Sequence, residues 1–329
     1  MSELGVGVVG CGTISHAYLR NGPRLEHVSY VACSDALLAR DDIDVVLCLT
    51  PPDWHAEVAL QAIGAGKHVY TEKPLATSVE AGRQVLAEAE AAGIRVGSAP
   101  DTFLGPGIET VREALERGVI GTPSVAVARM LAGPPEKWHE SPAFLYADLA
   151  GPLLDIGPYA VATAAQLFGP VRRVAALASR PREEGVIAAG PRVGTAFPIV
   201  EPTRVNGVLE HAGGVLTTLI ATFDADGAAQ HGIEIHGSDG TLLGGDMNTF
   251  HGPVILRRRG EEDEEIALVE GPTDNARGLG LEDLCRAVLE GTEQRASGAL
   301  GLHVLEILLA VRTAAAERRT VELQASVHR

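Results

Sequence analysis

Short apolar strands alternate with helices through the first hundred residues, and this alternation limits the fold more than any other feature. The runs Leu4–Val9, 28–33 and 45–49 are apolar throughout, which is typical of parallel strands buried on both faces. Two further strands and the helices between them complete the pattern, at 55–65, 68–71, 78–92 and 95–99. The pattern predicts an α/β fold with a doubly wound parallel sheet.

A chain of 329 residues is longer than one hydrophobic core usually organises, so two domains are expected. After a helix at 108–117 the sequence changes to strands rich in Thr, Val and Gly, and we place the boundary so that the domains are 1–122 and 123–329. The second half predicts a helix at 157–167 and an open, mainly antiparallel sheet, with closing helices at 280–290 and 300–317. This half is therefore expected to be an α+β domain.

The net charge of −16 argues against nucleic acid or an anionic membrane as a partner, since both require a basic surface. The four cysteines form no CxxC pair, which favours a reducing, cytoplasmic setting. We expect no secretory signal and no membrane-spanning run. The acidic run 261–265 is interpreted as a solvated turn, and the histidines are too scattered for a metal site.

The turn after the first strand carries Gly10, Gly12, Thr13, Ile14 and Ser15 and leads into a helix. Glycines spaced in this way let backbone N–H groups approach a pyrophosphate, which then lies at the helix N-terminus. The alternative is an ordinary glycine-rich turn that binds no ligand. The position of the turn nevertheless predicts a dinucleotide site, with Ser15 in the place of a third glycine.

Asp35 ends the next strand, 23 residues after Gly12. An acid at that place is expected to bind the adenosine ribose hydroxyls and to repel a ribose 2′-phosphate. The predicted cofactor is therefore NAD, and Arg40 is the residue that leaves NADP open.

The segment Glu72-Lys73-Pro74 directly follows the strand at 68–71. Because proline restricts the residue before it to extended backbone, the Lys73 ammonium is aimed by the chain itself. A surface ion pair between Lys73 and Glu72 is the alternative. If a cofactor binds nearby, Lys73 is the first candidate for the chemistry.

Thr50, Pro51 and His55 follow the strand at 45–49 at its carboxyl end, where ligands bind in such sheets. We predict that this loop borders the cofactor. The alternative is that it only forms the turn that starts the next helix.

The chain resembles the Gfo/Idh/MocA family of NAD(P)-dependent oxidoreductases. The residues that carry the resemblance are Thr50-Pro51-Pro52-x-x-His55, Gly66-Lys67-His68-Val69, Glu72-Lys73-Pro74 and, later, Trp138-His139 and the segment 151–159. The resemblance implies a Rossmann domain, a second domain whose open sheet builds a homodimer or homotetramer, and hydride transfer at a sugar or cyclitol carbinol.

The chain departs from the family where an Asp-x-Gly-x-His motif would supply the base, because Asp155 is present but Tyr159 stands at the histidine position. We hypothesise that Lys73 stabilises a phenolate at Tyr159, that Tyr159 takes the carbinol proton, and that Asp155 orients the substrate or Lys73. Alternatively Tyr159 is a pocket-wall aromatic and His139 is the base. Trp138 and Arg204 are further candidates for the substrate.

A second departure lies between Asp35 and Asp42, where about one helix-strand unit of the family pattern is missing. Either the sheet has lost that edge, or residues are missing from this sequence, since so short a parallel crossover is sterically awkward.

The leading interpretation is an NAD-dependent dehydrogenase acting on a sugar, a cyclitol or a sugar-derived polyol. Two alternatives stay open at this point. One is an enzyme that retains NAD and uses transient oxidation for glycosidic cleavage or epimerisation, and the other is a catalytically silent NAD-binding sensor.

Overall fold

The computed structural model describes residues 3–31, 36–227 and 232–323 of the chain. Within these residues one compact unit comprises 3–105 and 272–305, and the other comprises 106–271 and 306–323. The division differs from the predicted boundary near residue 122. The chain returns to the first unit after residue 271, a return that the sequence analysis did not predict.

The first unit contains a parallel sheet, five-stranded in its described part, with the order β2-β1-β3-β4-β5. Its strands are β1 (Leu4–Val9), β2 (Val28–Val31), β3 (Val45–Cys48), β4 (His68–Thr71) and β5 (Val96–Ser98). All four residues of β3 are buried, as expected for a central strand covered on both faces. The predicted α/β fold with a parallel sheet is confirmed.

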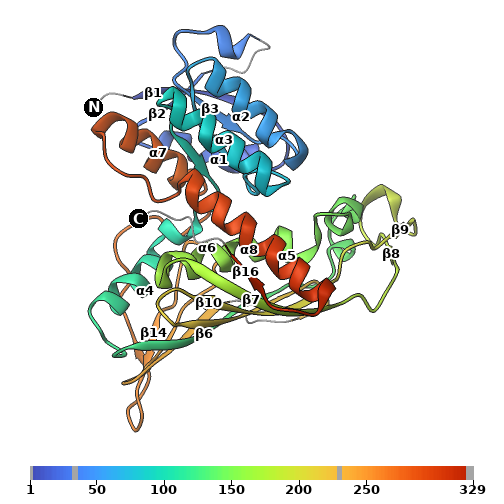
Figure 1. The fold of residues 1–329 in the computed structure, drawn as a ribbon, viewed down its shortest axis with the longest axis vertical. Coiled ribbons are helices and arrows are strands. Elements are labelled where there is room, and N and C mark those ends of the chain that lie inside the picture. Colours follow the sequence, from blue (N-terminus) through green and yellow to red (C-terminus); the bar gives the residue numbers. More distant parts are fainter. Residues whose placement is uncertain (1–2, 32–35, 228–231, 324–329) are drawn as a thin grey trace. The chain divides into compact units, whose positions relative to one another are not determined.

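Helices cover both faces of this sheet. The helices α2 (His55–Gly64) and α3 (Val79–Ala92) lie side by side on one face (Figure 1), where Val69 of β4 joins their common core. Successive strand residues point to opposite faces, so Tyr70 points to the other one, and it is there that α7 (Leu279–Glu290) packs. The short helix α1 (Ser15–Asn21) follows β1.

Local sequence signals set the ends of α3. The Ser78 hydroxyl accepts a hydrogen bond from the Ala81 N–H at 3.1 Å, which caps the helix N-terminus. Gly93 follows the last turn with a φ of 68°, the left-handed conformation that glycine adopts without strain. The predicted helix at 78–92 therefore agrees closely with the structure.

The second unit is built on a mixed, mostly antiparallel sheet. In the described residues it has the order β15-β14-β13-β12-β6-β11-β10-β7-β16, and only the β11–β6 pair is parallel. Its strands are β6 (Pro123–Leu131), β7 (Val171–Ser179), β10 (Arg204–His211), β11 (Leu216–Thr222), β12 (Gly232–Gly237), β13 (Thr241–Leu243), β14 (Ile255–Arg257), β15 (Glu264–Glu265) and β16 (Val321–Glu322). The predicted α+β character of this half is confirmed.

Helices and short turns complete the second unit. The helices are α4 (Pro106–Glu116), α5 (Gly151–Asp155), α6 (Gly157–Phe168) and the C-terminal part of α8 (Gly298–Glu317), and a separate hairpin pairs β8 (Glu184–Val186) with β9 (Ala196–Pro198). In both units, the 3-10 helices of the described residues are η1 (Gly22–Arg24), η2 (Leu37–Ala39), η3 (Pro52–Trp54), η4 (Thr102–Leu104), η5 (Pro135–Lys137), η6 (Pro142–Tyr146) and η7 (Gly190–Arg192).

The two faces of the large sheet differ in burial. Along β10, Val205, Leu209 and His211 are buried, whereas Arg204 and Val208, on the opposite face, are exposed. The helices α5 and α6 contact β11, and so cover the buried face. Within the second unit the other face is open.

The connection from β2 to β3 is short. Between residues 36 and 44 the structure describes the single 3-10 helix η2, and β2 is the edge strand of the described sheet. Asp35 lies outside the described residues. The two alternatives for the absent helix-strand unit, a lost sheet edge or residues missing from this sequence, both stay predictions.

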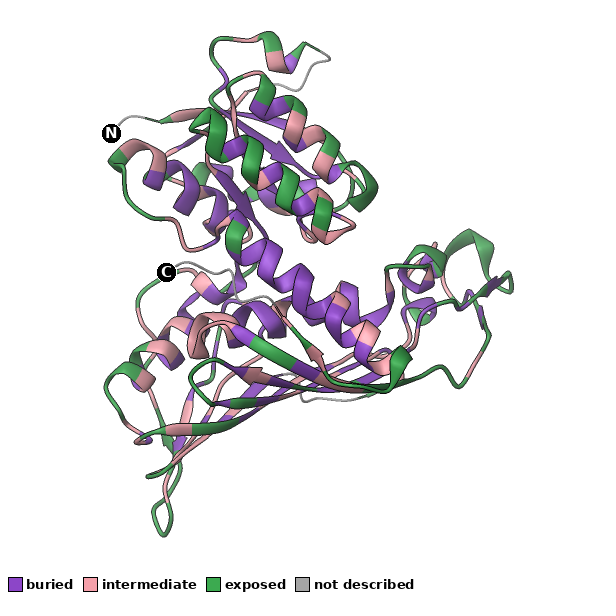
Figure 2. Ribbon diagram, viewed as in Figure 1, coloured by how far each residue is buried: buried purple, intermediate pink, exposed green. Residues whose placement is uncertain are grey.

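Helix α8 is long and apolar enough to cross a membrane by length and composition alone, with a mean hydropathy of 1.6 over its most apolar 18 residues. The sequence expectation that no run approaches this length is therefore wrong. However, 67% of that window is buried inside the protein, and Figure 2 shows α8 buried along most of its length. Core helices have the same composition, so the finding is weak support for a membrane span.

We predict that Gly280→Ala destabilises the protein by about 2 kcal/mol. A methyl group at Gly280 would lie 2.1 Å from the Tyr70 hydroxyl oxygen and 2.9 Å from Cβ of Asp101, so α7 would have to move away from the sheet. Urea unfolding measures the free energy change.

Gly64→Ala is the matched control, because Gly64 ends α2 and nothing lies within 4 Å of an added methyl group. This variant should be stabilised by about 0.5 kcal/mol. Equal effects of the two substitutions would contradict the close packing of α7 on β4.

Candidate functional site

The register of the parallel sheet brings three predicted loops to one edge. Val9 of β1 lies opposite Cys48 of β3, and Cys48 lies opposite Thr71 of β4. The next residues continue the ladder, since the Leu49 N–H donates to the Val9 carbonyl at 2.7 Å and the Glu72 N–H donates to the Cys48 carbonyl at 2.9 Å. The glycine turn, the Thr50–His55 loop and the Glu72–Pro74 segment therefore leave the sheet side by side.

The two glycines of the first turn have different structural roles. Gly10 has a φ of 100°, and a Cβ there would lie 2.5 Å from the Leu49 carbonyl carbon, so only glycine fits. At Gly12 an added Cβ would meet nothing within 4 Å. Gly12 and Thr13 are exposed and Ile14 is half-buried, so this backbone is accessible to a ligand. The open space fits the predicted dinucleotide pyrophosphate.

His55 connects two of the loops. Its side chain is 1% exposed, its Nε2 lies 2.8 Å from the Thr50 carbonyl oxygen, and its Nδ1 lies 2.6 Å from the Pro74 carbonyl oxygen. Both ring nitrogens are thereby engaged inside the protein. Thr50 is half-buried and Pro51 is exposed, so these two residues, and not His55, present atoms at the surface of this loop.

Glu72 and Lys73 are half-buried, and the peptide bond from Lys73 to Pro74 is cis. One oxygen of the Glu72 carboxylate, Oε2, accepts the Lys73 backbone N–H at 3.0 Å. The other oxygen, Oε1, accepts the hydroxyl of Tyr18 at 2.9 Å. Tyr18, which the sequence reasoning missed, is 0% exposed.

Asp101 is a buried carboxyl group of the first unit. Asp101 is 2% exposed and accepts the Gly278 and Gly280 N–H groups at 2.8 and 3.1 Å. Burial raises the pKa of Asp101, and the two backbone donors oppose that shift. Asp101 thus holds the start of α7 in the first unit.

In the second unit, Asp155 ends α5 and Tyr159 lies in the first turn of α6. Both are half-buried, and a single residue, Ile156, separates the two helices. The predicted substrate residues of this motif therefore sit on consecutive short helices, four positions apart.

Trp138 is 65% exposed and its ring contacts that of His139 edge-on, with centroids 5.5 Å apart. Nδ1 of His139 accepts the Ser141 backbone N–H at 2.9 Å. A ring nitrogen that accepts carries no proton, so the single proton of neutral His139 is on Nε2. Neutral His139 has no vacant acceptor, which argues against it as the base.

Glu136, two residues before Trp138, connects this segment to Tyr146 and Arg182. Glu136 is 5% exposed, accepts the Tyr146 hydroxyl, and pairs with Arg182 at 2.8 Å. Burial and Glu136 together raise the pKa of Tyr146, so Tyr146 stays a donor. The segment that carries Trp138 is therefore firmly attached to the second unit.

Arg204 is on the open face of β10 and donates from Nε to Asp224 Oδ2 at 3.0 Å. Asp224 also accepts the Thr203 hydroxyl at 2.6 Å and pairs with Arg182. Arg204 is thus an arginine on a surface strand that pairs with Asp224, and this geometry argues against its predicted contact with the substrate.

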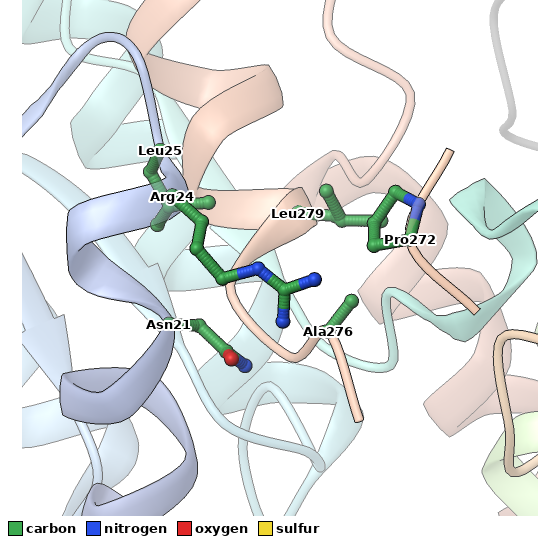
Figure 3. A pocket seen from close by; sticks show the side chains of 6 residues that line it. All are labelled: Asn21, Arg24, Leu25, Pro272, Ala276 and Leu279. Carbon is green, nitrogen blue, oxygen red and sulfur yellow. The ribbon is translucent and has the colours of Figure 1, made fainter. Parts of the chain in front are cut away.

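A cavity of about 330 Å³ lies in the first unit. Its lining residues are those labelled in Figure 3, namely Asn21, Arg24, Leu25, Pro272, Ala276 and Leu279. Asn21 donates to two carbonyls of the returning chain, those of Asn275 and Arg277, each at 2.8 Å. The cavity lies where the chain after residue 271 packs against α1 and η1, and none of the predicted site residues line it.

Two family models match the chain. Residues 23–99 match the oxidoreductase family with an NAD-binding Rossmann fold, and residues 108–243 match the GFO/IDH/MocA C-terminal domain.

Two curated relatives cover most of the chain. One is dTDP-3,4-didehydro-2,6-dideoxy-alpha-D-glucose 3-reductase of Actinomadura kijaniata, 29% identical over 85% of this chain and 79% of the relative. The other is 1,5-anhydro-D-fructose reductase of Ensifer adhaerens, 28% identical over 89% of this chain and 84% of the relative. A solved structure of levoglucosan dehydrogenase with NADH and L-sorbose has the same fold, with a TM-score of 0.79 at 21% identity, covering 98% of this chain and 100% of that one.

We predict that Gly12→Ala weakens NAD binding at least tenfold but changes the free energy of unfolding by less than about 0.5 kcal/mol. The added methyl group meets no protein atom within 4 Å and enters the space where the pyrophosphate would approach. Titration calorimetry with NAD measures the first effect and urea unfolding the second.

Gly10→Ala is the contrasting variant, since it should lower stability through the Leu49 contact. An unchanged NAD dissociation constant for Gly12→Ala would show that the dinucleotide does not use this turn.

Proposed function

Because the chain belongs to the Gfo/Idh/MocA family of oxidoreductases, we propose that it is an NAD-dependent dehydrogenase of a sugar, a cyclitol or a sugar-derived polyol. The observation that carries the proposal is the shared edge of the sheet, where Lys73 follows β4 and the glycine turn follows β1. The names of the two curated relatives, both sugar reductases, support the substrate class.

The preference for NAD over NADP rests on Asp35 and is supported by the contacts of Arg40. Its guanidinium donates to both carboxylate oxygens of Asp42, at 2.8 and 2.7 Å. An arginine held in this way is less available to a ribose 2′-phosphate.

In the proposed reaction, bound nicotinamide supplies the hydride acceptor or donor. Lys73 stabilises the negative charge that develops on the reacting oxygen, and Tyr159 accepts the carbinol proton. Asp155, four residues before Tyr159, orients the substrate hydroxyls. Trp138 offers an exposed indole face, on which the apolar face of a sugar ring can stack.

Removal of either reacting side chain tests these roles. Tyr159→Phe and Lys73→Met should each lower kcat by about a hundredfold or more, since a positioned proton acceptor typically contributes that much. Steady-state kinetics from a broad polyol screen, followed through NADH absorbance in both directions, gives the rates. NAD affinity of Tyr159→Phe, measured by calorimetry, is the control and should stay within a factor of two.

A Tyr159→Phe enzyme with an undiminished maximal rate would overturn the proton role of Tyr159. Single-turnover measurements complete the test. Release of NADH supports net dehydrogenation, whereas tightly retained NAD without an absorbance change would support transient oxidation instead.

The open face of the large sheet supports the proposal of a homodimer or homotetramer. Exposed apolar residues gather on adjacent strands of this face, since Leu216 lies opposite Val125 and Val208 occupies the neighbouring strand. The exposed fractions of Leu177, Val208, Leu216 and Val125 are 68, 41, 41 and 39%. A second copy of the chain would bury this apolar area, which is the largest favourable contribution to association.

We predict that the double variant Val208→Glu, Leu216→Glu is monomeric, because paired interfaces would bury four uncompensated carboxylates. Light scattering after size-exclusion chromatography measures the mass. Val186→Glu, which places a charge on the separate β8–β9 hairpin at a residue 52% exposed, is the control and should leave the oligomer intact. A monomeric unsubstituted protein would contradict the proposal.

A further inference from the structure

The Glu72 carboxylate joins the lysine segment to helix α1. Its Oε2 accepts the Lys73 backbone N–H at 3.0 Å, and its Oε1 accepts the Tyr18 hydroxyl at 2.9 Å. Tyr18 is on α1, which begins directly after the glycine turn. One carboxylate is therefore held by the lysine backbone on one side and by a side chain 54 residues away on the other.

Tyr18 is suited to be a permanent donor in this arrangement. Its side chain is 0% exposed. Burial raises its pKa well above the ordinary value for tyrosine, and the nearby Glu72, Tyr70 and Asp101 raise it further. The phenol therefore keeps its proton and acts as the hydrogen-bond donor to Glu72 Oε1.

The same segment is anchored a second time on its C-terminal side. His55, at the start of α2, contacts the Pro74 carbonyl oxygen at 2.6 Å. Lys73 thus lies between two anchored backbone groups, its own N–H and the carbonyl of the next residue. With the backbone fixed in this way, the direction of the ammonium depends on the side-chain torsions of Lys73 alone.

We propose that Tyr18 is a positioning residue for Lys73, acting through the carboxylate of Glu72. The hydroxyl fixes the carboxylate, the carboxylate fixes the Lys73 N–H, and the glycine turn and the lysine become parts of one hydrogen-bonded unit. The proposal rests on the proposed function only in that Lys73 is taken as catalytic.

The low lysine content of the chain permits a direct test that needs no substrate. Lys67, Lys73 and Lys137 are its three lysines. Reductive methylation with ¹³C-formaldehyde gives each dimethyl-lysine an NMR signal, and loss of one signal in Lys73→Arg assigns Lys73. In Tyr18→Phe the Lys73 signal should shift while those of Lys67 and Lys137 stay in place.

Tyr30→Phe is the matched control. It also removes one hydroxyl from a tyrosine, here a half-buried one, whose partner is the Tyr18 backbone carbonyl at 3.3 Å and not Glu72. In this variant the Lys73 signal should not move. An unmoved Lys73 signal in Tyr18→Phe, or an equal shift in both variants, would overturn the proposal.

Kinetics gives the second readout. Tyr18→Phe should lower kcat by about tenfold, the effect expected for loss of one positioning hydrogen bond, with KM and the NAD dissociation constant within about twofold. A structural defect alone would change all three quantities. Because Tyr18 is proposed to act through Glu72, Tyr18→Phe should lower kcat only slightly further in a protein that already carries Glu72→Gln. If the two substitutions lower kcat independently, so that their effects on the activation free energy add, Tyr18 does not act through Glu72.

The two readouts separate the two proposals. If the unsubstituted protein oxidises no polyol, the proposed function fails, and the Lys73 signal still decides the role of Tyr18. If Tyr18→Phe does not fold, the comparison of Glu72→Gln with the unsubstituted protein takes its place, and an unmoved Lys73 signal there overturns the proposal.

Discussion

The parallel pairing of β1 with β3 and of β3 with β4 is the constraint on which the candidate site depends. Each strand is short, so the level at which it ends is set by the register of the sheet and by little else. A shift of one residue in any of the three would turn side chains to the opposite face and separate the loops that follow. Such a shift would expose the buried residues of β3 and β4 to water and so lower the stability of the fold. The packing of this core therefore fixes the positions of the loops that form the site.

Most of what the sequence predicts is local. The apolar runs, the glycines of the first turn and the Lys-Pro pair each act over a few residues, and all of these elements are present in the structure. Such features are predictable because the backbone itself imposes them. The contact of Gly10 with Leu49 was not predicted, because it depends on β3 pairing next to β1.

The contacts that hold the site are of another kind. Tyr18 meets Glu72 across 54 residues, and Asp101 meets the start of α7 across 177. A buried tyrosine on a helix is expected to pack inward, but periodicity does not identify its partner. For His55 the sequence left a choice between contact with the cofactor and a role in a turn, and the structure instead gives it two backbone carbonyls. Pairings of this type depend on the assembled fold.

The return of the chain to the first unit after residue 271 has a consequence for biosynthesis. Gly280 of α7 lies against Tyr70, and the N–H groups at the start of α7 donate to Asp101. These residues are synthesised long after the strands of the parallel sheet. During translation this face of the sheet stays uncovered while more than a hundred and fifty further residues are added. The second unit is also completed late, because the C-terminal part of α8 and strand β16 follow α7 in the sequence. Both units therefore gain their final helical cover only after most of the chain has been made.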